Sequence, residues 1–177
     1  MTYGVVLDTA LFKLPETGMR EVKEFTKWDA ARIRKELAGK PAPELEVTDI
    51  KGNPVSLANL KGKTVLLDFW TSWCPPCLAD APSLDKLYAR YGSTNLMIIG
   101  ISVNEERDIV ERFLQKKPHV FPVVLTSENE MQHPYQVGKF PTYMVIAPDG
   151  TLNAAFEGDQ GFGELRRHLE KAGMPTE

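Results

Sequence analysis

The chain of 177 residues has only two cysteines and three histidines, which limits the metal chemistry that it can support. A structural zinc site takes four ligands, commonly a second pair of cysteines or a spaced pair of histidines. His119, His133 and His168 are scattered along the chain and show no such spacing. The sequence therefore gives no indication of a metal site, and nothing in it indicates a bound nucleotide or flavin.

The sequence also lacks an excess of one charge, a long apolar run and a signal peptide. Its formal net charge of −3 gives no reason to expect nucleic acid or an anionic membrane as a partner. The longest apolar runs, such as residues 96–101, have the length of a strand and are too short to span a bilayer. The N-terminus shows no basic stretch followed by an apolar segment. We therefore expect either a cytosolic protein or a part of a longer exported precursor.

What the chain does contain, after a proline-rich boundary at residues 40–43, is an alternation of segments typical of an α/β domain. Residues 64–70 are almost continuously apolar, as in a strand covered on both faces. Ile109, Phe113 and Leu114 are expected to face inward from one helix. The predicted elements are a hairpin at 45–57, strands at 64–70, 96–103, 121–125, 142–147 and 151–156, helices at 74–91, 105–117 and 164–172, and a helix start at 127–130.

The two cysteines, Cys74 and Cys77, enclose two prolines and follow the predicted strand at 64–70. A ring that small gains little from loop-closure entropy, so a structural cross-link is a poor explanation for the pair. A dithiol that opens and closes explains it better, because two thiols at the start of a helix stay within bonding distance in both redox states. The amide hydrogens and the positive dipole end of that helix favour a thiolate at Cys74. An inert buried pair is the alternative interpretation.

Several further motifs occur in a fixed order around this pair. They are PEL at 43–45, LKGK at 60–63, DFWTSWCPPC at 68–77, and FPTYMVI at 140–146 before DG at 149–150. Together they resemble the thioredoxin-like thiol–disulfide oxidoreductases of the ResA/TlpA type, over residues 39–177. The resemblance implies a thioredoxin fold, in which a central mixed β-sheet is flanked by helices, with an N-terminal hairpin and an extra helix and strand at 104–125.

The resemblance also implies roles for individual residues. Cys74 corresponds to the cysteine that attacks the substrate, and Cys77 to the one that resolves the mixed disulfide. Pro141 corresponds to a cis-proline beside the disulfide, where the missing N–H leaves an edge for an extended substrate strand. An apolar rim around the dithiol is expected from four residues, namely Trp73, Pro76, Phe140 and Pro141.

Two acidic residues depart from the usual pattern of the ResA/TlpA branch. Asp68 stands where this branch often has Asn, although plain thioredoxins have a buried Asp there. Burial would raise the pKa of such a carboxyl group, which makes Asp68 a candidate general base for Cys77. Asp80 stands where the branch usually has Glu. Its shorter side chain leaves two interpretations open, a role near the thiols or an acid on the helix surface.

Residues 1–39 differ from the domain at 40–177 and are predicted to form an N-terminal extension, with a strand at 3–7 and a short helix at 28–37. Residues 5–15 weakly resemble the closing strand and tail of LolA-like lipoprotein-carrier domains. On that interpretation the chain is the C-terminal piece of a larger exported protein. A local extension of the thioredoxin-like domain is the alternative.

These features predict a thiol–disulfide oxidoreductase that acts as a monomer on disulfides of extracytoplasmic proteins and is regenerated by an upstream thiol reductant. We expect it to be a reductant, because the prolines between the cysteines supply neither a charge nor an N–H, and no His stands there as in DsbA-type proteins. Its potential should then lie nearer to about −270 mV than to about −120 mV. Cys74 is expected to be the more exposed and more acidic thiol.

Three other functions remain open at this point. A redox-responsive binding module would use the same cysteine pair without turnover, because a fold does not determine a function. A disulfide oxidase or isomerase would use it at a higher potential. A peroxiredoxin-like peroxidase is a third alternative, but its peroxidatic cysteine lies in a different local pattern.

Overall fold

The computed structural model describes residues 36–127, 134–135 and 137–175, which form a five-stranded sheet, a two-stranded hairpin and the helices around them. The strands of the larger sheet are β3 (Thr64–Trp70), β4 (Leu96–Val103), β5 (Val123–Thr126), β6 (Thr142–Ile146) and β7 (Leu152–Glu157). Their order is β5-β4-β3-β6-β7. β3, β4 and β5 are parallel, whereas β6 and β7 pair antiparallel with their neighbours. This mixed sheet confirms the predicted fold class.

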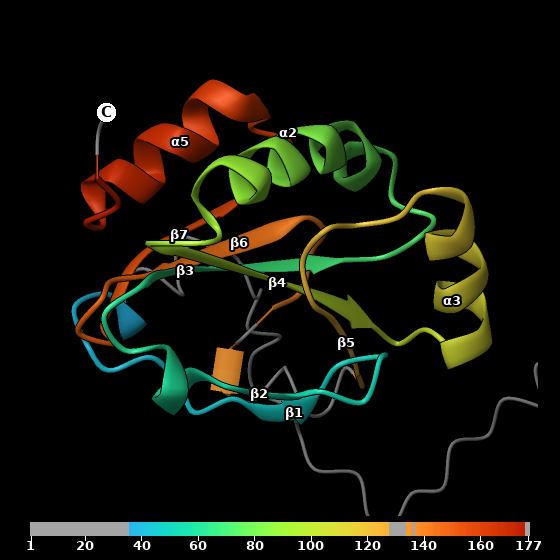
Figure 1. Cartoon of the computed structure of the whole chain (residues 1–177), viewed down its shortest axis with the longest axis horizontal. Helices are drawn as coiled ribbons and strands as arrows, with labels where there is room; N and C mark the ends of the chain where they lie inside the picture. Colours follow the sequence, from blue (N-terminus) through green and yellow to red (C-terminus); the bar gives the residue numbers. More distant parts are fainter. Residues whose placement is uncertain (1–35, 128–133, 136, 176–177) are drawn as a thin grey trace, which may run out of the picture.

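Helices and a hairpin cover the two faces of this sheet (Figure 1). The covering elements are α2 (Pro75–Tyr91) and α5 (Gly161–Lys171) on one face, and β1 (Glu46–Thr48), β2 (Pro54–Ser56) and the 3-10 helix η2 (Leu57–Leu60) on the other. α3 (Arg107–Lys116) precedes β5 and packs beside the first turn of α2 through Val110. The extra helix and strand expected at 104–125 are therefore α3 and β5.

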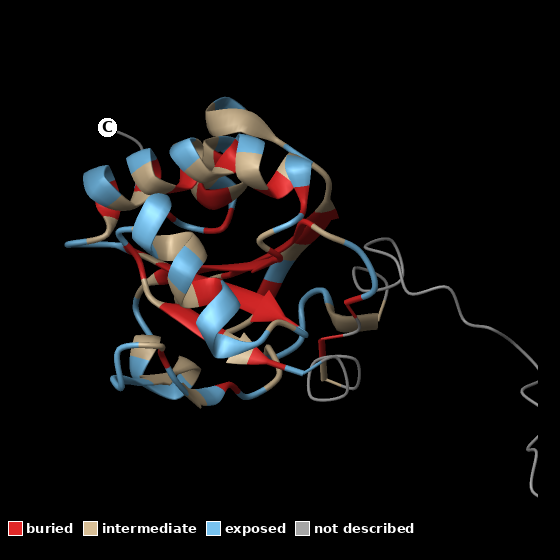
Figure 2. Cartoon of the chain, turned by 90° about the vertical axis from the view of Figure 1, so that its right-hand side faces the viewer, coloured by how far each residue is buried: buried red, intermediate tan, exposed pale blue. Residues whose placement is uncertain are grey.

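β3 is buried along its whole length and belongs to the buried strands that are red in Figure 2. Its side chains alternate between the two layers. Leu67 and Phe69 pack toward the hairpin, whereas Leu66 packs toward α2 and α5. Because alternate residues of a strand face the same side, Asp68 and Trp70 share the α2 face with Leu66. An ionisable side chain therefore lies beneath the helix that begins with the cysteines.

The hairpin expected at 45–57 is present, and its turn is built around Asp49. The Asp49 carboxylate accepts hydrogen bonds from the backbone N–H groups of Lys51 and Asn53, at 2.9 and 2.8 Å. Gly52 has a φ of 89°, a conformation that a residue without Cβ adopts at little cost. The side chain of Asp49 thus supplies the hydrogen bonds that the tight turn needs.

The residues that precede β1 are tied to the start of β7. The Gly39 N–H donates to the Leu152 carbonyl, and the Leu152 N–H donates to the Lys40 carbonyl, both at 2.9 Å. The strand expected at 3–7 lies outside the described residues, as does the helix expected at 28–37 apart from its last two residues. The extension and its boundary at residue 40 remain predictions.

The inward face of α3 contains Val110 in place of the predicted Ile109, together with the predicted Phe113 and Leu114. Ile109 is 41% exposed, whereas its neighbour Val110 is fully buried. Phe113 and Leu114 are half-buried and pack against the same cluster as Val110. Since a helix repeats every 3.6 residues, positions 110, 113 and 114 share a face. The inward orientation predicted for Ile109 is therefore wrong.

The ends of several elements differ from the prediction, most clearly the starts of α5 and β5. α5 begins at Gly161 instead of residue 164, and β5 begins at Val123 instead of residue 121. The helix start expected at 127–130 lies outside the described residues after Ser127. Within the described part of the chain, no helix combines the length and the apolar character needed to cross a membrane.

Candidate active site

Cys74 and Cys77 are joined by a disulfide at the start of α2, with their Cα atoms 5.3 Å apart. Cys74 is the N-cap of the helix, and its sulfur accepts a hydrogen bond from the Cys77 N–H at 3.3 Å. Pro75 and Pro76 occupy the first two helical positions, where they have no N–H to offer. At the start of the helix, the Cys74 sulfur therefore receives a hydrogen bond from the Cys77 N–H and none from the two prolines.

Both cysteines are buried in the disulfide form. Cys74 is 4% exposed and Cys77 is 6% exposed, so the predicted greater exposure of Cys74 is wrong for this form. Both side chains are buried because they pack in one apolar cluster with Trp70 of β3 and Val110 of α3. If a thiol reagent prefers one of the two cysteines, we expect the cause to be a difference in thiol acidity after reduction, because burial in the disulfide form does not distinguish them.

The predicted apolar rim, composed of Trp73, Pro76, Phe140 and Pro141, lies partly at the surface. Trp73 is 69% exposed, and its ring meets that of Phe140 edge to face with centroids 6.4 Å apart. Phe140 is half-buried and packs against the cluster that contains both cysteines. The Phe140–Pro141 peptide bond is cis, and Pro141 is buried. Trp73 and Phe140 thus form an aromatic pair next to the disulfide, in which Trp73 is exposed and Phe140 is half-buried.

Asp68 is buried beneath α2, and its Oδ1 atom has no hydrogen-bond partner among the described residues. Burial raises the pKa of Asp68 to about 8, and the nearby charge of Asp80 contributes further in the same direction. A buried carboxyl group is more easily kept neutral than ionised, because the low-dielectric interior penalises its charge. At neutral pH Asp68 is therefore mostly protonated, as the sequence reasoning on a buried carboxyl group anticipated.

Asp80 is buried and joins three elements, so the interpretation as an acid on the helix surface is wrong. Its carboxylate accepts hydrogen bonds from the Tyr143 hydroxyl at 2.9 Å and from the N–H groups of Gln160 and Gly161 at 2.6 and 2.7 Å. The last two donors belong to the N-terminus of α5, where free amides favour a negative charge. Asp80 therefore fixes α5 to α2 and also places a charge near Asp68.

We expect Asp80→Ala to lower the free energy of unfolding by about 3 kcal/mol, because it leaves one buried donor, the Tyr143 hydroxyl, and two part-buried N–H donors without this partner. Urea unfolding of the oxidised protein measures the change. Asp159→Ala is the matched control, since Asp159 is an exposed acid beside the same helix start. Equal stabilities of the two variants would contradict the role assigned to Asp80.

Glu105, which sequence reasoning did not single out, bonds to the loop in front of the cysteines. Its carboxylate accepts hydrogen bonds from the N–H and the hydroxyl of Ser72 and from the hydroxyl of Ser102. No local pattern reveals this contact, because Ser72 and Glu105 are 33 residues apart in the sequence. The ring contact of His119 with Trp70 likewise joins distant segments, so no local pattern reveals it. His119 stacks on Phe121 and meets Trp70 edge to face.

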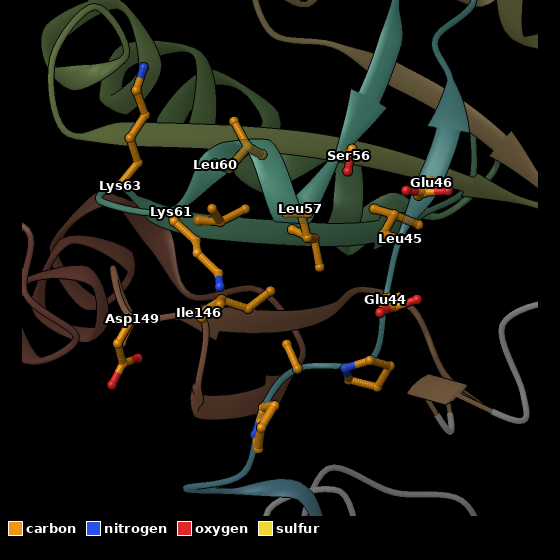
Figure 3. A pocket seen from close by; sticks show the side chains of 17 residues that line it. Glu44, Leu45, Glu46, Ser56, Leu57, Leu60, Lys61, Lys63, Ile146 and Asp149 are labelled. Carbon is orange, nitrogen blue, oxygen red and sulfur yellow. The ribbon is translucent and has the colours of Figure 1, made fainter.

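A cavity of about 320 Å³ lies elsewhere, between the hairpin layer and the opposite end of β3 (Figure 3). Its walls are largely apolar and include Leu45, Leu57, Leu60, Val65 and Ile146. It contains none of the predicted site residues. Among the described residues, no three His, Cys, Asp or Glu side chains are grouped closely enough to hold a metal ion. Among the described residues, the predicted site residues therefore lie at the disulfide end of the sheet and away from this cavity.

Comparison with known proteins gives consistent relatives. The AhpC/TSA family matches residues 38–155. Thiol-disulfide oxidoreductase ResA of Bacillus anthracis is 35% identical over 133 residues, which cover 75% of this chain and 77% of the relative. ResA of Geobacillus kaustophilus is 33% identical over 132 residues, with 75% and 76% covered.

Solved structures show the same relationship in three dimensions. A putative thiol:disulfide interchange protein DsbE from Chlorobium tepidum superposes with a TM-score of 0.70 at 25% identity, over 76% of this chain and 96% of the other. StoA from Bacillus subtilis gives 0.63 at 27% identity, over 72% and 96%. A secreted Mycobacterium tuberculosis disulfide oxidoreductase gives 0.63 at 26% identity, over 71% and 94%.

The strand order, together with a disulfide in the first turn of the helix that follows the central strand, defines a protein of thioredoxin fold with a dithiol redox centre. Relatives at 33–35% identity are thiol–disulfide oxidoreductases that span most of the chain. The chain belongs to the AhpC/TSA family and is a thiol–disulfide oxidoreductase similar to ResA. The resemblance and the enzyme class predicted from the sequence are both confirmed.

Proposed function

We propose that this enzyme reduces disulfides of protein substrates outside the cytoplasm. The observation that carries the direction is the composition of the first turn of α2, where two prolines stand between the cysteines. They provide the Cys74 sulfur with neither a charge nor an N–H, and the Cys77 amide supplies one hydrogen bond. The Cys74 thiolate is therefore stabilised less than in a strong oxidant such as DsbA, and because this makes the reduced form less favourable, the dithiol gives up its electrons more readily.

The reaction proceeds in two exchange steps. The Cys74 thiolate attacks a substrate disulfide, forms a mixed disulfide and releases the first substrate thiolate. Cys77 gives its proton to the ionised form of Asp68, then attacks the Cys74 sulfur and releases the second substrate thiolate. The substrate gains two electrons and, with two protons, ends as a dithiol, while Cys74 and Cys77 end as the disulfide that the structure contains.

The environment of Asp68 supports its assignment as the base. A proton moves efficiently between groups of similar pKa, and the pKa of Asp68 is raised to about 8, close to that of an ordinary thiol at about 8.5. An exposed carboxyl group at about 4 would be too weak a base for this step. The position of Asp68 supports the same assignment. Asp68 lies on the face of β3 that packs against α2, the helix that carries Cys77.

The apolar rim binds the substrate in this proposal. The exposed Trp73 ring and Phe140 offer an aromatic surface, and the backbone before β6 offers an edge for an extended chain near Pro141. The enzyme works as a monomer, without a cofactor, and receives its electrons from an upstream thiol reductant. The secreted mycobacterial relative supports a location outside the cytoplasm.

The redox potential of the Cys74–Cys77 pair tests the direction. We expect a value close to that of thioredoxin, about −270 mV, measured by equilibration with glutathione or dithiothreitol buffers at pH 7. We also expect the enzyme to accelerate the reduction of insulin by dithiothreitol. A potential near about −120 mV would instead identify an oxidase or an isomerase.

A further inference from the structure

Glu105 lies in the turn between β4 and α3 and connects that turn to the loop in front of Cys74. Its Oε2 atom accepts hydrogen bonds from the Ser72 N–H and the Ser102 hydroxyl, both at 2.8 Å. Its Oε1 atom accepts a hydrogen bond from the Ser72 hydroxyl at 2.5 Å. Hydrogen bonds to a carboxylate are stronger than those between neutral groups. We call this set of three hydrogen bonds the Glu105 bridge.

The backbone of β4 places Glu105 where it can make this bridge. Asn104 has a φ of 57°, a left-handed conformation that Asn tolerates better than most residues, and its N–H donates to the Thr126 carbonyl. The chain therefore turns sharply at the end of β4. Ser102 lies opposite Trp70 in the register of β4 with β3, so the carboxylate spans the ends of both strands.

The loop that receives the bridge is a turn closed in front of the disulfide. The Cys74 N–H donates to the Thr71 carbonyl at 3.2 Å, which leaves Ser72 and Trp73 as the two central residues of the turn. Glu105 binds Ser72 through both its backbone and its side chain, so the orientation of this turn is fixed. Trp73 projects from the same turn into solvent and meets Phe140 at its edge.

We propose that Glu105 is a positioning residue for substrate binding, which holds the turn so that the exposed Trp73 ring stands ready for a protein substrate. The proposal rests on the proposed function, since it assigns Trp73 to the surface that binds the substrate. A surface held in its binding orientation loses less freedom when the substrate binds. A small disulfide reaches the cysteine without this surface, so its reaction should not depend on Glu105.

Single-turnover oxidation of the reduced enzyme tests the proposal with two disulfides, insulin and bis(2-hydroxyethyl) disulfide. For Glu105→Ala we expect a rate constant with insulin about tenfold lower, which corresponds to about 1.4 kcal/mol. The rate constant with the small disulfide and the redox potential should stay unchanged. Glu105→Gln should restore the rate with insulin, because its carbonyl can accept from the Ser72 and Ser102 donors and its amide can donate to the Ser72 hydroxyl.

Two controls make the effect specific. Glu106→Ala removes the same charge from the exposed neighbouring residue and should leave both rates unchanged. In a double-mutant cycle, Glu105→Ala should have little further effect once Trp73→Ala is present, because both changes act on the same surface. If Glu105→Ala does not fold, Ser72→Ala takes its place and should lower the rate with insulin less strongly.

Four results would overturn the inference. They are an unchanged rate with insulin, an equal loss with both disulfides, a shifted potential, and a full effect of Glu105→Ala in the Trp73→Ala background. The second and third would mean that Glu105 acts on the cysteines themselves. A wild-type enzyme that reacts with the small disulfide but not with insulin would instead overturn the proposed reduction of protein substrates.

Discussion

Replacing Cys77 by serine is expected to convert the enzyme from a catalyst into a trap for its substrates. Cys74 keeps its place at the N-terminus of α2 and still attacks a substrate disulfide. No thiol is then available to release the product, so the mixed disulfide persists. Turnover of insulin should fall by about a thousandfold or more, as is usual when a covalent catalyst loses an essential group.

Cys74→Ser is the matched variant, and it should trap no substrate because the attacking sulfur is gone. Non-reducing gels and mass spectrometry of alkylated mixtures detect the trapped complexes. In the reduced wild-type protein, alkylation at mildly acidic pH should label Cys74 first. Because the two residues are equally buried in the disulfide form, this selectivity should come from thiolate formation at the helix start. Equal trapping by both serine variants would reverse or abolish the assigned order of attack.

Asp68→Asn is expected to slow the second exchange step far more than the first. With the pKa of Asp68 at about 8, the fraction of ionised base rises as the pH approaches that value. The rate of resolution in the wild-type enzyme should therefore follow the ionisation of Asp68 and level off near pH 8, whereas in the variant it should be lower and follow only the ionisation of the Cys77 thiol at higher pH. Stopped-flow measurement of mixed-disulfide formation and decay between pH 6 and 9 separates the two steps. An identical pH profile for decay in both proteins would remove Asp68 from the mechanism.

The same substitution should change how stability depends on pH. An ordinary Asp side chain has a pKa of 3.8, whereas the pKa of Asp68 in the folded protein is about 8, so the native state keeps a proton that the unfolded state releases. The free energy of unfolding of the wild-type protein should fall as the pH rises between these values and then level off. The Asp68→Asn variant lacks this fall. The difference between its free energy of unfolding and that of the wild type should therefore shift in favour of the variant by up to about 4 kcal/mol between pH 5 and pH 9.

Urea unfolding of the oxidised proteins at pH 5, 7 and 9 measures this difference. Asp159→Asn serves as the control, because Asp159 is exposed and its substitution should give a curve parallel to that of the wild type. Parallel curves for Asp68→Asn as well would mean that the carboxyl group is not kept neutral in the fold.

The features that could be predicted from the sequence are those that short segments encode. The apolar run at 64–70 predicted a strand covered on both faces, and burial of Asp68 follows from its place within that run. The cysteine pair after this strand predicted a dithiol at a helix start, where Cys74 is the N-cap. Each of these inferences depends on residues within one turn or one strand of each other.

The features that could not be predicted depend on contacts between distant segments. Asp80 faces inward because the N-terminus of α5, eighty residues later, supplies donors for its carboxylate. Glu105 reaches Ser72 across the ends of two strands. For Ile109, a short amphipathic helix allows two neighbouring alignments of its apolar face, and packing against the cysteine cluster selects the one with Val110 inward.

The hydrogen bonds that tie Gly39 and Lys40 to Leu152 also fix where the described chain enters the fold relative to the disulfide. The described chain enters the fold at the left of Figure 1, whereas α3 and the first turn of α2 lie at the right. The register of β3 with β6 shows the same separation, with Val65 opposite Ile146 at one end and Phe69 opposite Thr142 at the other. The described chain therefore enters the fold at the end of the sheet opposite the disulfide, so this entry segment does not cover the surface around the cysteines.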